Sequence, residues 1–151
     1  MMSQRVKRSI RQLEVFLKAI YILEDEIRYS ATPVVLLMKK LSEDSVCGKL
    51  LIFANCHKYL MQGVQFQKAF HDAIDASRDE IYLESEDIDL ILAFGNGLGV
   101  SDVEGQILNT KRYSKIFEGR IADLKEKTRS KVKLYESLGL LTGIFVAILL
   151  I

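Results

Sequence analysis

The stretch Lys133–Ile151, KLYESLGLLTGIFVAILLI, decides how the rest of this chain is interpreted. From Leu138 onward it has no charged side chain, and only Thr142 carries a polar side-chain atom. As a helix, residues 134–151 would be roughly 27 Å long, against a hydrocarbon core of about 30 Å. A helix that fills a domain core is the alternative, but such a helix is expected to keep a polar stripe. The stretch therefore predicts a C-terminal transmembrane helix over residues 134–151.

Basic residues precede this apolar stretch and also open the chain. Residues 125–133 contain five basic residues and one acid, Glu126, and at the start of the chain no acid occurs before Glu14. Basic flanks are typical of the cytoplasmic side of a membrane span. The predicted membrane-flanking residues are Arg5, Lys7, Arg8, Arg11, Lys125, Lys127, Arg129, Lys131 and Lys133.

The middle of the chain is acidic, although the whole chain has a net charge of only +1. Anionic lipid would attract the basic ends and repel this middle, so we expect the acidic face to point away from the membrane. There it would be a candidate surface for a protein partner, because charge complementarity sets encounter rate and specificity. Its residues are Asp79, Glu80, Glu84, Glu86, Asp87 and Asp89.

Apolar residues recur at steps of three and four almost throughout, which predicts helices rather than strands. The predicted helices cover residues 6 to about 30, 33 to about 41, 46 to 61, 66 to about 78, 85 to 98, and 101 into the anchor. The fold class is therefore an all-α, six-helix bundle over residues 1–133, a cytosolic domain whose last helix runs into the membrane segment.

Local signals mark several predicted helix ends. Thr32 is expected to cap the second helix, with Pro33 at its first position. Gly63 suits a left-handed helix stop. Ser101 with Glu104 forms a capping-box pattern that would start the last helix. A thin apolar seam runs along this helix to Leu138, but polar residues at Thr110, Ser114 and Thr128 interrupt it, so its membrane-proximal half is expected to pack less tightly.

Three sequence patterns are candidates for a catalytic, cofactor-binding or metal-binding site. The GNGLG run at residues 95–99 follows a helical pattern and lacks the spacing of a dinucleotide or phosphate loop, so its glycines indicate a helix end and a close helix approach. Cys56 and His57 are adjacent, but Cys47 would point to the opposite face of the same helix, which leaves no zinc ligand set. The acidic middle lacks the spacing of a calcium loop. We therefore predict no catalytic residue, cofactor or metal, and neither a nucleic acid nor a small-molecule substrate as ligand.

Several short motifs occur in a characteristic order. Residues 23–29, LEDEIRY, precede Thr32-Pro33, and Gly63 is followed by Ala69-Phe70. Further on come Phe94-Gly95, Leu98-Gly99, Asp102 and Gln106, and Ser137-Leu138-Gly139 precedes the apolar end. In this order the chain resembles the stage III sporulation protein AB family over nearly its whole length.

This resemblance implies a non-enzymatic scaffold in the channel complex between mother cell and forespore of endospore-forming bacteria. It implies a domain similar to the cytosolic domains of type II secretion inner-membrane platform proteins. The implied partners are a secretion-type ATPase, stage III sporulation protein AA, and other membrane proteins of the channel, with membrane lipid. The implied location is the mother-cell membrane facing the forespore, with the domain on the cytoplasmic side. The family also has a membrane segment before the basic stretch that corresponds here to residues 5–11, whose charges would flank it.

A second class of function fits the same sequence. The chain would then be a soluble or peripheral helical regulator whose C-terminal helix packs into a protein partner instead of lipid. Extraction of membranes with alkaline carbonate distinguishes the two classes.

Overall fold

The structure is a computed structural model that describes residues 3–150. Its α-helices are α1 (Gln4–Ser30), α2 (Val34–Glu43), α3 (Leu51–Met61), α4 (Phe66–Ala76), α5 (Ser85–Gly97) and α6 (Val103–Leu150), with 3-10 turns η1 (Cys47–Lys49) and η2 (Arg78–Glu80). Within residues 3–150 there is no strand. The prediction of an all-α fold of six helices, the last running unbroken into the apolar stretch, is confirmed.

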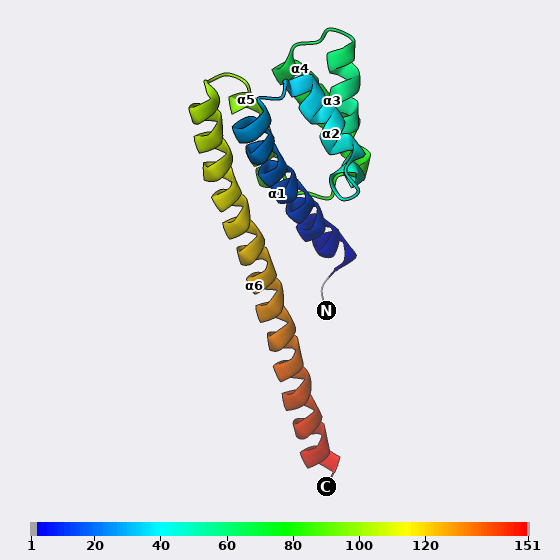
Figure 1. The fold of residues 1–151 in the computed structure, drawn as a ribbon. Helices are drawn as coiled ribbons and strands as arrows, with labels where there is room; N and C mark the ends of the chain where they lie inside the picture. The colour runs from blue at the N-terminus through cyan, green and yellow to red at the C-terminus, as the bar shows by residue number, and fades with distance from the viewer. Residues whose placement is uncertain (1–2, 151) are drawn as a thin grey trace.

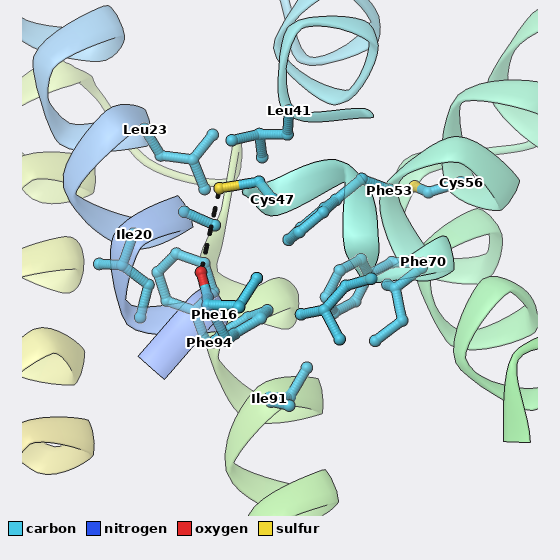
Figure 2. Close-up of a cluster of buried hydrophobic side chains, with 14 of the residues drawn as sticks. Phe16, Ile20, Leu23, Leu41, Cys47, Phe53, Cys56, Phe70, Ile91 and Phe94 are labelled. Carbon is cyan, nitrogen blue, oxygen red and sulfur yellow. Dashed lines mark hydrogen bonds between the residues drawn. The ribbon is translucent and has the colours of Figure 1, made fainter. Parts of the chain in front are cut away.

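The long helices α1 and α6 run antiparallel, and α2 to α5 pack beside them (Figure 1). Four phenylalanines tie these elements together. The ring of Phe16 on α1 lies 6.1 Å from Phe53, 5.8 Å from Phe94 and 5.2 Å from Phe117, measured between centroids. Figure 2 shows Phe16, Phe53 and Phe94 within this cluster of buried side chains. Aromatic pairs at these separations add stability beyond the area they bury.

Packing along α6 ends well before the helix does. Ile121 is buried and Leu124 is half-buried, but Tyr135 is 66% exposed and Leu138 is 51% exposed. The seam is therefore packed as far as Leu124, and its residues Tyr135 and Leu138 nearer the apolar stretch are exposed, which agrees with the looser packing expected there. The reason is that most of the packing on α6 comes from α1 and α5, and the helix continues past both of them (Figure 1). We call the end of the bundle where α6 leaves it the exit end.

Two predicted helix starts differ from the structure. Pro33 is the N-cap of α2, with ψ of 150°, and the Thr32 hydroxyl donates to Glu26 Oε2 at 2.9 Å instead of capping. At the last helix, Asp102 Oδ1 accepts the Gly105 N–H at 2.8 Å, so Asp102 is the cap in place of Ser101. At α6 the Asp102 carboxylate accepts a free backbone N–H of the first turn, and at α2 the extended N-cap backbone falls on Pro33, one residue after Thr32.

The third helix begins at Leu51, five residues later than predicted from Val46. Asp44 Oδ2 accepts the N–H groups of Val46 and Cys47 at 3.0 and 2.9 Å, which holds the chain in a turn before η1. These bonds, that from Cys47 first, lower the pKa of Asp44 to about 2. A short polar side chain that bonds local backbone groups competes with a helix in this way.

The glycines behave as predicted. Gly63 and Gly99 have φ of +86° and +80°, values that favour glycine. A Cβ on Gly95 would lie 2.3 Å from Cδ1 of Phe70, so this glycine lets α4 and α5 approach closely. The GNGLG run thus closes one helix and sets a helix contact.

Replacing Gly95 with alanine should lower the free energy of unfolding by about 1–3 kcal/mol, because the buried Phe70 ring must shift. Urea denaturation followed by circular dichroism measures this change. Gly119→Ala is the matched control, since its Cβ would meet nothing within 4 Å, and it should raise stability by about 0.5–1 kcal/mol. Equal effects of the two substitutions would contradict the proposed contact.

Candidate membrane anchor and docking surfaces

The C-terminal part of α6 is the candidate membrane anchor. Within residues 3–150, α6 is the one helix long and apolar enough to cross a membrane, and none of its most apolar window is buried in the bundle. Side chains such as Leu140, Phe145 and Leu149 are 67%, 62% and 69% exposed. An uncovered apolar face of this size is a site of interaction with lipid or with another protein.

A basic segment of α6 lies between the bundle and this apolar part. All five of its basic residues are exposed: Lys125, Lys127, Arg129, Lys131 and Lys133. Lys125 Nζ also lies 2.8 Å from Glu14 Oε1 on α1, so an ion pair joins the two long helices at this level. The other four extend along the free helix toward the apolar part.

The basic start of α1 lies at the same end of the molecule. Tyr21 bonds Glu118, and Glu14 pairs with Lys125, which sets α1 antiparallel to α6. The first residues of α1 therefore lie at the exit end (Figure 1). The predicted flanking residues Arg5, Lys7, Arg8 and Arg11 are all exposed there. The fold thus brings together two basic groups that are more than a hundred residues apart in the sequence.

The predicted acidic face is altered in two respects. Asp87 is fully buried and does not belong to any surface, whereas Asp79, Glu80, Glu84, Glu86 and Asp89 are exposed. The first part of the face also lies beside the start of α1. The backbone oxygen of Glu80 accepts a hydrogen bond from Gln12 at 2.7 Å, which holds η2 against the start of α1. Charge patterning did not reveal that this segment packs beside the start of α1, and the direction of the face relative to the membrane stays a prediction.

Asp87 instead forms a buried ion pair with Arg120 that joins α5 to α6. Arg120 Nε lies 2.6 Å from Asp87 Oδ1, and Glu86 Oε2 lies 3.8 Å from Arg120 Nη2. The hydrogen bond to Asp87 raises the pKa of the Arg120 guanidinium. Sequence reasoning missed this pair, because the two residues are far apart in the chain and Asp87 looks like its exposed acidic neighbours. The ion pair therefore links α5 to α6, the helix that carries the candidate membrane anchor.

The sequence candidates for chemistry are dispersed. Burial raises the pKa of Cys56 to about 12, and that of Cys47, on η1 and not on α3 as predicted, to about 11. His57 Nδ1 lies 3.2 Å from the Val35 carbonyl oxygen. Thiols with such values are poor nucleophiles at neutral pH. On the surface of α4, ligand atoms of His71, Asp72 and Asp75 lie within 4.8 Å of one another, a spacing common on exposed helices without an ion.

These features define a class of protein, an all-helical domain built on a long helix that continues outward as a candidate membrane span. The family model described as Stage III sporulation protein AB matches residues 1–151, so the chain belongs to this family. The predicted resemblance is confirmed, and family membership supports a role in sporulation.

Two relatives agree with this assignment. Stage III sporulation protein AB of Bacillus subtilis (strain 168) is 26% identical over 144 residues, which are 95% of this chain and 82% of the relative. A solved structure of stage III sporulation protein AB matches the fold with a TM-score of 0.67 at 23% identity, covering 82% of this chain and 98% of that one.

Replacing Arg120 with methionine should cost about 3–5 kcal/mol of stability, because the buried Asp87 carboxylate loses its partner. Denaturation of the full chain in detergent measures the change. The double variant Asp87→Leu with Arg120→Met should regain most of the loss, since it removes the unpaired charge as well. Arg112→Met, at an exposed position of the same helix, is the control and should change stability by less than about 0.5 kcal/mol. A double variant no more stable than the single one would contradict the pairing.

Proposed function

We propose that this protein is a membrane-anchored, non-enzymatic scaffold of the channel complex between mother cell and forespore, and that it docks a secretion-type ATPase. The observation that carries the proposal is the single helix α6. Its first half is packed into the bundle, and its last part is apolar and uncovered. Residues 134–151 would cross the mother-cell membrane, with the bundle on the cytoplasmic side.

The charges at the exit end support this orientation. Lys131 and Lys133 lie only about 7–11 Å from Leu138 along the helix, which places them close to the layer of lipid headgroups. The basic start of α1 would lie above the same headgroups. Each basic residue close to an anionic surface contributes about 1 kcal/mol of attraction. Lipid is thus the proposed contact of the flanking residues closest to the apolar stretch, Arg5, Lys7, Lys131 and Lys133.

The scaffold would act by holding the ATPase at the membrane and by transmitting its movement to α6. A bound ATPase that pulls or turns the bundle acts on α6 directly, because Phe117 and Arg120 hold this helix in the core. The same helix then carries the displacement into the membrane without an intervening loop. A helical regulator whose α6 inserts into a protein groove is the second candidate, favoured only by the exposed apolar surface itself.

Membrane extraction tests the anchor. The full chain, expressed alone in bacteria, should remain in the membrane after an alkaline carbonate wash. Leu141→Lys with Ile144→Lys should move it to the soluble or aggregated fraction, since each central lysine costs about 2.5–3.5 kcal/mol of insertion. The control is Leu108→Lys with Ile116→Lys, two exposed apolar positions of α6 beside the bundle, which should stay in the membrane. Release of the parent chain by carbonate would instead favour the helical regulator.

Binding kinetics test the remaining acidic face. Reversal of Glu84, Glu86 and Asp89 to lysine should slow association with the purified ATPase partner about five- to tenfold at low salt, with the dissociation rate unchanged. Exposed charges mainly steer encounter, so the effect should shrink as salt is added. Asp87 is not substituted, because its loss would break the ion pair with Arg120 that links α5 to α6. An unchanged association rate at low salt would remove this face from the docking surface.

A further inference from the structure

A groove of about 350 Å³ lies between α1 and the turn that contains η1, closed on one side by the segment after η2. We call it the basic groove. Its rim carries Arg8, Arg11, Lys18 and Lys49, its floor is Val15, Val46 and Leu50, and Gln12, Glu14 and Tyr82 complete its lining. Apart from Arg8 and Arg11, which are also predicted membrane-flanking residues, its lining belongs to neither the anchor nor the acidic face, and its residues come from three separate parts of the sequence.

The wall formed by Tyr82 is held by α1. Gln12 Oε1 accepts the Tyr82 N–H at 2.8 Å, and Gln12 Nε2 donates to the Glu80 oxygen at 2.7 Å. Arg8 Nη1 donates to the Tyr82 hydroxyl at 3.0 Å, and its guanidinium lies 4.9 Å from the centre of the ring. A neutral phenol does not cancel the charge of Arg8. This wall is therefore preformed and remains cationic.

The opposite wall is held by Asp44. Its carboxylate fixes the backbone of Val46 and Cys47, and Lys18 Nζ lies 3.5 Å from Asp44 Oδ2. The apolar side chains of Val46 and Leu50 are thus presented by a rigid turn rather than by a loose loop. Preorganised walls reduce the conformational entropy that a partner loses on binding.

The charge of the groove is not balanced within the bundle. Its one acid, Glu14, lies 2.8 Å from Lys125 outside the lining. In the part of the chain that the structure describes, Arg11 and Lys49 form no ion pair. Three cations, Arg8, Arg11 and Lys49, therefore surround an apolar floor without an acidic partner. The complementary ligand has apolar side chains flanked by carboxylates.

The position along α6 argues against lipid as the occupant. Glu14 lies level with Lys125, and Leu138 is about 20 Å further along the helix. The headgroup layer is only about 5–8 Å deep on each side, so the floor of the groove stays in water when the apolar stretch is in the bilayer. A protein segment can reach this level, whereas a lipid of the same membrane cannot.

We propose that the basic groove binds an amphipathic helix of a partner protein, with acidic side chains on the rim and apolar side chains on Val15, Val46 and Leu50. The inference rests on the proposed docking function and gives it a contact that the acidic face lacks, a desolvated apolar centre inside a charged rim. Such centres supply most of the binding energy of an interface. The groove therefore governs dissociation, and the neighbouring acidic face governs encounter.

The test uses the full chain in nanodiscs of uncharged lipid and two probes. One probe is a labelled synthetic helix with leucines on one face flanked by glutamates, and the other is the purified ATPase partner. Arg11→Glu with Lys49→Glu should weaken binding of both the peptide and the ATPase at least about tenfold at low salt, mainly through slower association, because both charges lie on the exposed rim. Val46→Ala should weaken both about threefold by shortening the floor. Both charge changes are at exposed positions without ion pairs, so the melting temperature should not change.

Lys39→Glu with Lys58→Glu, exposed positions outside the groove, is the matched control and should bind both probes like the parent. A scrambled peptide of the same composition that binds equally well would overturn the proposal, as would groove variants that bind both probes like the parent. Loss of binding to anionic vesicles without loss of peptide binding would assign the groove to lipid and would also overturn it. If the parent binds the peptide but not the ATPase, the groove stands and the proposed ATPase docking fails.

Discussion

One helix in two surroundings is the constraint on which the rest of this structure depends. Along its first half α6 is part of a protein core, where Phe117 is fully buried and Arg120 reaches the buried Asp87. Further along, every residue from 133 to 150 of the same unbroken helix is exposed. Since backbone hydrogen bonds are satisfied within a helix, it can leave the bundle without exposing unpaired groups. The candidate anchor and the part of α6 packed in the bundle therefore belong to one continuous helix.

The antiparallel packing of α1 on α6 decides where the charges meet. It brings the basic start of the chain to the level of the basic segment of α6, through contacts such as Glu14 with Lys125. It also brings the acidic residues after α4 to this end, because Gln12 binds Glu80 and Tyr82. The acidic residues thus lie beside the basic start of α1, although the sequence separates these two groups by more than sixty residues. Two adjacent surfaces of opposite sign restrict how a partner can be oriented on the bundle.

Local patterns predicted the helices well where one residue type controls the geometry. Gly63 adopts the left-handed backbone that its position suggested, the glycines of residues 95–99 close a helix, and the spacing of apolar residues located the helices of the bundle. The same local patterns gave the wrong helix start where two neighbouring residues compete to bind the free backbone N–H groups. Asp102 and not Ser101 caps α6, and Asp44 delays the third helix by binding two backbone N–H groups. Such competition is settled by distances that a pattern does not contain.

The sequence by itself determined the class of the protein. An apolar end without charge, basic flanks and an almost uninterrupted helical period are properties of neighbouring residues, so they can be recognised without coordinates. Only the tertiary structure decided which charges are available. Asp87 is buried against Arg120 while Glu86 and Asp89 beside it are exposed, and Arg8, Lys49 and Tyr82 share one groove. The physical reason is that burial and charge pairing depend on residues brought together by the packing of helices that are distant in the chain.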